Sequence, residues 1–211
     1  MSSAYPGGAP DVACASMFPA GHGFLAQMSS APFKIILPKS TYAPGETIQV
    51  TISSAGGTVF RGLYVQARKI GCDVLDDNPV GAFTAPDPSL QTRHCFGNVN
   101  SAVTHTSSEE KSSVTIYWTA PVVPLGHVQI RSTIVSNTST FWTGIESNPL
   151  IDLHAIDPPS CFNRSHSTVA TSLRHEKLLI NSAITQSNLP INFIVVNFTI
   201  VRTILIITHA V

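Results

Sequence analysis

The sequence predicts an all-β fold, an antiparallel β-sandwich, followed by a non-globular C-terminal tail. Apolar and polar residues alternate with a period of two in several short runs, which is typical of half-buried strands. No window of 11 or more residues before Ser160 keeps an apolar stripe of helical spacing, so a parallel sheet would have no crossover helices. All 13 glycines lie between Gly7 and Gly144, and 14 of the 15 prolines precede residue 160. The turn-rich part of the chain therefore ends early.

The predicted strands are short and number seven to nine. The alternation is clear at Ile48, Val50 and Ile52, which polar residues separate. Each of the less regular candidates is bounded by Gly, Pro, Asn or Ser, which favour turns. The candidates are, in chain order, residues 33–38, 48–52, 59–68, 80–85, 93–96, 102–106, 114–118, 128–134 and 140–146.

Two turns are predicted from their residue types. Pro44 and Gly45 fit the two central positions of a type II turn, in which proline presets φ and glycine takes a positive φ. This turn should initiate the strand that contains Ile48. The polar run 136–139 separates two alternating runs, which predicts a hairpin with a four-residue loop.

The chain divides into three parts. We expect residues 1–148 to form the sandwich, residues 149–188 a poorly ordered linker and residues 189–211 an apolar tail. The tail has about the length of a membrane span, but Arg202 interrupts it and makes it a marginal membrane segment. Three alternatives are a C-terminal anchor, a cleaved lipid-anchor signal after residues 181–183, and read-through into AT-rich noncoding sequence. We favour the third, because the last 67 residues contain no glycine.

Charge and motifs exclude several classes of protein. The chain has 12 basic and 12 acidic side chains, and only 11% of its residues are charged, so it offers no field for nucleic acid. No G-x-S-x-G, H-E-x-x-H, P-loop or G-x-G-x-x-G motif is present. The acidic group Asp73, Asp76 and Asp77 lacks the spacing of a calcium loop. We predict no catalytic, cofactor-binding or metal-binding residues and no enzymatic activity.

The histidines and the late aromatic residues have structural roles in this interpretation. None of the eight histidines pairs with another at i, i+2 or i, i+4. We expect His22 and His105 to fix loops by hydrogen bonds rather than to bind a metal. Phe141 and Trp142 should be one core and one surface aromatic residue of a final strand.

Four cysteines, Cys14, Cys72, Cys95 and Cys161, lie far apart and lack zinc-ligand spacing. Cys14 and Cys95 both fall in the folded segment. A bridge between them would close a loop of about 80 residues and would contribute roughly 4–5 kcal/mol in the chain-entropy model. The alternative is four buried free thiols in a cytosolic domain. Sparse charge and N-x-S/T triplets favour a location outside the cell, where disulfides persist.

Three triplets match the N-glycosylation acceptor sequence, at Asn137, Asn163 and Asn197. Only Asn137 falls in a predicted exposed hairpin. We therefore predict that Asn137 carries a glycan if the chain is secreted.

A series of motifs resembles the reeler domain family, in order and at family-like spacing over about residues 5–148. The opening motif is Tyr5-Pro6-Gly7-Gly8-Ala9-Pro10, and Ala13-Cys14, Met17, Pro19 and His22-Gly23 follow it. No single motif is decisive, but the series together is specific. The further motifs are Tyr42-Ala43-Pro44-Gly45, Phe60-Arg61-Gly62-Leu63, Gln66-Ala67-Arg68, Cys95-Phe96-Gly97, Ala102-Val103-Thr104-His105-Thr106, Trp118-Thr119-Ala120-Pro121 and Phe141-Trp142.

The resemblance implies an immunoglobulin-like β-sandwich, a disulfide between Cys14 and Cys95, and an extracellular, non-catalytic module. Cys72 and Cys161 do not map onto the usual family positions. Family members carry a signal peptide, whereas residues 1–4 have neither a basic nor an apolar region. We expect an extracellular or membrane-associated chain whose signal peptide is not visible in this sequence.

Two functions from different classes follow from the resemblance. The first is a non-catalytic extracellular binding or adhesion module in innate defence or matrix interaction, with a glycan, matrix or microbial-surface ligand as its partner. The alternative is the truncated ectodomain of a ferric-chelate-reductase-like membrane electron-transfer protein, in which a haem-bearing membrane domain follows. No nucleic-acid partner is expected, and the C-terminal tail would supply any membrane anchoring.

Overall fold

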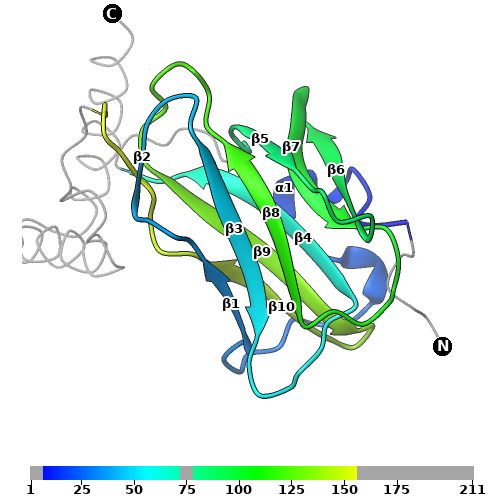
Figure 1. Ribbon diagram of the computed structural model, residues 1–211. Coiled ribbons are helices and arrows are strands. Elements are labelled where there is room, and N and C mark those ends of the chain that lie inside the picture. The colour runs from blue at the N-terminus through cyan, green and yellow to red at the C-terminus, as the bar shows by residue number, and fades with distance from the viewer. Residues whose placement is uncertain (1–6, 72–77, 156–211) are drawn as a thin grey trace, which may run out of the picture. The chain divides into compact units, whose positions relative to one another are not determined.

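The computed structural model describes residues 7–71 and 78–155, which form two β-sheets packed face to face (Figure 1). Neighbouring strands within both sheets are antiparallel. The four-stranded sheet contains, in spatial order, β1 (Phe33–Ile36), β3 (Thr47–Ser54), β8 (Ser113–Thr119) and β5 (Ala82–Thr84). The five-stranded sheet contains β10 (Thr140–Glu146), β9 (Val128–Asn137), β4 (Gly62–Lys69), β7 (Asn98–His105) and β6 (Leu90–Cys95). The predicted antiparallel sandwich is confirmed.

The alternation of apolar residues builds the core between the two sheets. β3 and β8 pair so that Ile48 lies opposite Trp118 and Val50 lies opposite Ile116. These four side chains are buried, and Ile130 of β9 joins the same cluster from the other sheet. Burial of one such side chain contributes roughly 1.5–3 kcal/mol of transfer free energy. The period-two pattern is therefore the main source of stability.

Two short strands extend the fold beyond the predicted set. β2 (Thr41–Tyr42) and β11 (Ile151–Asp152) pair in parallel. Leu150, just before β11, is fully buried and bridges to Val128. The fold thus continues past residue 148, where the sequence analysis places the end of the sandwich. The remainder of the predicted linker after residue 155 and the predicted tail at 189–211 lie outside the described residues.

Both predicted turns are present, one with a shorter loop. Gly45 has a φ of 76°, and the Glu46 N–H donates to the Ala43 carbonyl at 3.1 Å, which confirms the turn at Pro44-Gly45. β9 extends to Asn137, which pairs with Thr140. The hairpin loop between β9 and β10 therefore has two residues rather than the predicted four, because the polar residues at the strand ends still pair.

Helices contribute little to the described part of the chain. They are α1 (Ala13–Ser16) and the 3-10 helix η1 (Ala20–His22), both in the N-terminal segment. Within residues 7–71 and 78–155, no helix has the length and apolar character required to cross a membrane. The segment that carries α1 and η1 packs on the sandwich and forms a pocket with it.

Candidate functional site

The N-terminal segment crosses the outer face of the five-stranded sheet, and we call residues 7–29 the strap. In Figure 1 the blue start of the chain lies beside β4, β6 and β7. Backbone groups of the strap form hydrogen bonds with all five strands. The contacts, in strap order, join Gly7 O to Arg93 of β6 (2.7 Å), Ala9 N to Thr104 of β7 (2.9 Å), Cys14 O to Arg68 of β4 (2.8 Å), Met17 O to Thr133 of β9 (2.6 Å) and Gln27 N to Phe141 O of β10 (2.8 Å).

β4 is buried on both of its faces, by the other sheet on one side and by the strap on the other. Leu63, Val65 and Ala67 belong to the core between the sheets. Tyr64, which alternates with them, belongs to a second cluster with α1, and Gln66 and Arg68 on the same outer face bond to strap carbonyls. Every residue from 62 to 68 is buried as a result. The outer face of β4 is therefore an interior surface rather than a solvent-exposed one.

A disulfide holds the strap against β6. Cys14 in α1 and Cys95 at the end of β6 are bonded, with their Cα atoms 5.6 Å apart, which is the pairing that the family resemblance implies. The Tyr64 hydroxyl lies 3.3 Å from Cys14 Sγ and 3.0 Å from Cys95 Sγ. Burial raises the pKa of Tyr64. The phenol therefore stays protonated beneath the disulfide.

A buried arginine anchors the end of α1. The residue Arg68 is only 2% exposed, and its guanidinium donates to Cys14 O at 2.8 Å and to Ala15 O at 3.3 Å. Its Nε also donates to Gln66 Oε1 at 2.8 Å. A cation is favoured beside the last carbonyls of a helix. The arginine therefore satisfies polar backbone groups that the strap brings into the interior.

An apolar pocket of about 250 Å³ lies between the strap and the sheet. Strap residues before, within and after α1 form one wall. The sheet supplies the opposite wall. The residues on the sheet side are Leu63, Tyr64, His105, Thr133 and Val135, and those on the strap side include Ala9, Val12, Ala13, Ser16, Met17, Phe18 and Ala20.

The polar groups around this pocket already have partners within the protein. The Thr133 hydroxyl donates to Met17 O, and the Tyr64 hydroxyl lies against the disulfide sulfurs. The Nδ1 atom of His105, a residue only 5% exposed, lies 3.3 Å from Leu63 N and accepts from it. The Ser16 hydroxyl accepts from Phe18 N at 3.1 Å. The pocket therefore presents mainly carbon to a ligand.

The structure confirms one predicted histidine role and corrects another. The His22 ring bonds to Thr138 O at 3.0 Å and so ties the strap to the β9–β10 hairpin. His105 does not fix a loop: it lies within β7 and contacts β4 across the sheet. Because His105 follows four buried residues of β7, its position is set by strand pairing.

The predicted aromatic pair also differs from the expectation in part. Phe141 is fully buried, as predicted for the core member. Trp142 is half-buried rather than on the surface, because its ring packs edge-on against Phe33 at 5.4 Å and its indole N–H donates to Ser29 O at the end of the strap. Both residues lie in β10, which β11 follows, so this strand is not the final one.

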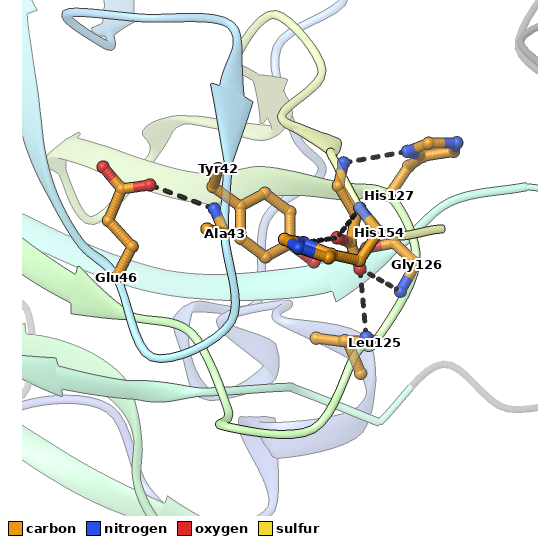
Figure 2. Close-up of polar contacts among 8 residues, drawn as sticks. Tyr42, Ala43, Glu46, Leu125, Gly126, His127 and His154 are labelled. Atoms are coloured by element: carbon orange, nitrogen blue, oxygen red, sulfur yellow. Dashed lines mark hydrogen bonds and ion pairs between the residues drawn. The ribbon is translucent and has the colours of Figure 1, made fainter. Parts of the chain in front are cut away.

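A polar cluster at the β2–β11 pair closes one end of the sandwich. Figure 2 shows Tyr42, Leu125, Gly126 and His154 gathered around this point. The Asp152 side chain, which is fully buried, accepts hydrogen bonds from the N–H groups of Leu125 (3.1 Å), Gly126 (3.0 Å) and His154 (2.8 Å). The Tyr42 hydroxyl donates to Gly126 O.

These contacts change the titration of both side chains. Burial raises the pKa of Asp152, but hydrogen bonds from the three backbone N–H groups outweigh it and leave the pKa below its usual value. Burial and the nearby Asp152 charge raise the pKa of Tyr42. The hydrogen bonds that Asp152 accepts come from backbone N–H groups, and the His154 ring lies 3.9 Å from its Oδ1, so the cluster acts as a structural clasp rather than as acid–base machinery.

A larger surface groove of about 540 Å³ follows the edge strand β1 and includes Glu146 and Asn148. Edge strands are sites at which another strand can add. Here β1 has only four residues, Pro32 and Pro38 flank it, and Lys34 is exposed on it. These are features that protect an edge from pairing, so this groove is a weaker candidate than the pocket.

No metal centre is found among the residues that the structure describes, since no three His, Cys, Asp or Glu side chains there come together to hold an ion. Asn137 is exposed at the hairpin, and its Oδ1 accepts from the N–H and hydroxyl of Ser139 at 3.1 and 3.0 Å. The other residues singled out from the sequence lie outside the described part: Cys72, Asp73, Asp76, Asp77, Cys161, Asn163 and Asn197.

Sequence reasoning missed the role of the residues that hold the strap over the sheet. Gln66 and Arg68 alternate with apolar residues and so resemble the solvent face of a strand. Their burial depends on a segment about fifty residues earlier in the chain, to which no local pattern points. The one available signal was the uncharged stretch after Asp11, which is unusually apolar for a surface loop.

The two antiparallel sheets and the disulfide-tethered strap define an immunoglobulin-like β-sandwich module. The chain belongs to the reeler domain family, because the family model described as "Reeler domain" matches residues 12–155. The human F-spondin reeler domain has the same fold, with a TM-score of 0.50 at 20% identity, over 61% of this chain and 94% of that one.

Two relatives connect the chain to different kinds of protein. It is 40% identical over 151 residues to "Putative defense protein 3" of Antheraea mylitta, a match that covers 71% of this chain and 88% of the relative. It is 33% identical over 146 residues to "Ferric-chelate reductase 1" of Mus musculus, covering 69% of this chain and 24% of the relative. The chain thus spans about a quarter of the reductase.

Proposed function

We propose that this chain is a non-catalytic binding module that acts outside the cell in defence against microbes. The observation that carries this proposal is the match to a defence protein over 88% of that relative's length. A disulfide supports an oxidising location, since such bonds are rare in the cytosol. The titratable groups described above hold the strap and the end of the sandwich, which supports binding rather than catalysis.

A microbial-surface glycan is the partner that we propose, and a matrix polysaccharide is the competing choice. The test is binding of the purified chain to peptidoglycan, fungal β-glucan and heparin. We expect saturable binding to a microbial glycan, with an affinity that changes little between 50 and 200 mM salt, because the net charge is zero. Binding to heparin alone would favour the matrix role, and no affinity for any of the three would overturn the proposal.

The second candidate function is the ectodomain of a ferric-chelate-reductase-like membrane protein. The 33% identity to the mouse reductase, over its reeler-like quarter, favours it. The discriminating experiment is recovery of the full transcript. An in-frame haem-bearing membrane domain after the reeler domain would support this candidate. A stop codon in the same place in related genes would favour the defence module, and the same transcript decides whether residues 189–211 are an anchor.

We also propose that Asn137 carries an N-linked glycan. It is exposed, it begins an Asn-x-Ser triplet, and it lies at a two-residue hairpin loop. Secretion from a eukaryotic cell should give a product whose mass falls after endoglycosidase treatment. Asn137→Gln should reduce that mass change by one glycan, because the triplets at Asn163 and Asn197 remain, whereas Asn148→Gln, outside any acceptor triplet, should leave it unchanged. An unchanged mass in the wild-type chain would contradict the proposal.

A further inference from the structure

We propose that the pocket beneath the strap binds a single linear hydrocarbon chain of roughly ten carbon atoms. The inference goes beyond the proposed function and does not depend on a glycan being the partner. It goes further by naming the site and the chemical class of ligand. It rests on three features of the pocket: its lining, its size and its rim.

The lining excludes a sugar as the group that enters. Thr133, Tyr64 and Ser16 are the hydroxyl side chains of the pocket, and each is already within hydrogen-bond distance of a partner in the protein. A sugar ring buried here would leave several of its own hydroxyls without partners, and unpaired buried polar groups oppose binding. A hydrocarbon chain has no such groups. The carbon surfaces of Val135, Ala9 and Met17 suit it.

The size of the pocket sets the length of the hydrocarbon chain that it can hold. An internal cavity of about 150 Å³ holds one benzene molecule. On that scale the volume of about 250 Å³ holds roughly ten carbon atoms. The pocket is smaller than the 300–1,000 Å³ of sites for drug-sized ligands. It is therefore too small for a large polycyclic lipid, and one alkyl chain of about ten carbons is enough to fill it.

The rim is apolar and almost free of charge. Val12 lines the pocket and is 85% exposed. Asp11 is the single Asp, Glu, Lys or Arg residue between positions 7 and 33. The strap side of the pocket therefore offers an amphiphile a surface with few charges.

The first test uses uncharged n-alkanols from hexanol to dodecanol with the purified chain. Affinity should rise about fourfold for each added methylene group and should level off near ten carbons. The methyl resonances of Ala9, Ala13 and Val135 should shift on binding, while those of Val114 in the core should not. Affinity that is independent of chain length, or shifts spread over the whole domain, would overturn the inference.

The second test blocks the pocket at its mouth. Ala20 is exposed and lines the pocket, whereas Ala15 is equally exposed on the same strap and does not line it. Ala20→Trp should weaken decanol binding at least tenfold, and Ala15→Trp should change it less than twofold. Equal effects of the two substitutions would refute the assigned site. Neither position is buried, so both variants should fold.

Two further experiments distinguish where the hydrocarbon comes from and which of the two proposals fails. Phosphatidylcholine vesicles test whether a lipid in a bilayer can supply the chain, and monomeric decanol tests a free amphiphile. The glycan assays are repeated on Ala20→Trp. Loss of alkanol binding with glycan binding retained assigns the pocket to the hydrocarbon alone. Glycan failure with alkanol binding intact overturns the proposed function and leaves the pocket assignment standing.

Discussion

Removing the Cys14–Cys95 disulfide should destabilise the whole sandwich. The perturbation is the double substitution Cys14→Ala with Cys95→Ala. The bond joins residues 81 apart in the sequence, for which the chain-entropy relation gives a loss of about 4.5 kcal/mol in the free energy of unfolding. For a domain of this size the melting temperature should fall by roughly 9–18 °C. Loss of the sulfur contacts of Tyr64 acts in the same direction.

The assay is thermal and urea unfolding of the wild-type and double-substituted chains, followed by circular dichroism. Thr133→Val serves as the comparison, because it removes one hydrogen bond from the strap, to Met17 O, and leaves the crosslink intact. It should cost about 1 kcal/mol. A loss below 1 kcal/mol for the double substitution would refute the reasoning, since it would mean that the strap detaches before the sandwich unfolds.

Three further predictions concern single positions. Asp152→Asn should cost about 1–3 kcal/mol, because one of the two oxygens that accept backbone N–H groups is lost. The lowered pKa of Asp152 means that its carboxylate stabilises the fold above about pH 4 and that this contribution is lost as pH falls through the folded-state pKa. The acid limb of a stability–pH curve should therefore be flatter for the variant, and superimposable limbs would argue against the clasp. Arg68→Met should cost about 1–3 kcal/mol in urea unfolding, since Cys14 O and Gln66 Oε1 lose a donor, whereas Lys69→Met on the same strand should change stability by no more than about 0.5 kcal/mol; similar values for the two would contradict a structural role for the guanidinium. Gly81→Ala should cost about 2–5 kcal/mol, because Gly81 has a φ of 69° and an added Cβ would lie 2.6 Å from Thr119 O. Gly56→Ala shares the positive φ but has open space around it and should cost about 1–2 kcal/mol; an equal loss at both would exclude the contact as the cause.

Local patterns predicted most of the sandwich because its strands bury one face each. The nine strands of the two main sheets fall within or beside the predicted ranges, since period-two alternation depends only on near neighbours. β2 and β11 were missed because two residues, such as Thr41 and Tyr42, are too few to show a period. Their pairing depends on Asp152, whose buried position no neighbouring residue indicates.

The candidate site was much less accessible to sequence reasoning. The resemblance implied the pairing of Cys14 with Cys95, but not that residues 7–29 cross the sheet. Tyr64, Gln66 and Thr133 are ordinary strand residues in sequence, and they line or support the site only because a distant segment covers them. Burial by non-local packing leaves no periodic trace, so a pocket formed in this way is visible only in the folded structure.

The strap imposes an order on the synthesis of the chain. Residues 7–29 leave the ribosome before the strands that they contact, since their contacts require β6, which ends at Cys95, and β10, which contains Phe141. Throughout that interval the apolar strap has no sheet to cover. Cys72 emerges before Cys95, so the first thiol that Cys14 can meet on the nascent chain is not its final partner. A bond between Cys14 and Cys72 formed in that interval would have to be exchanged before Cys14 could pair with Cys95.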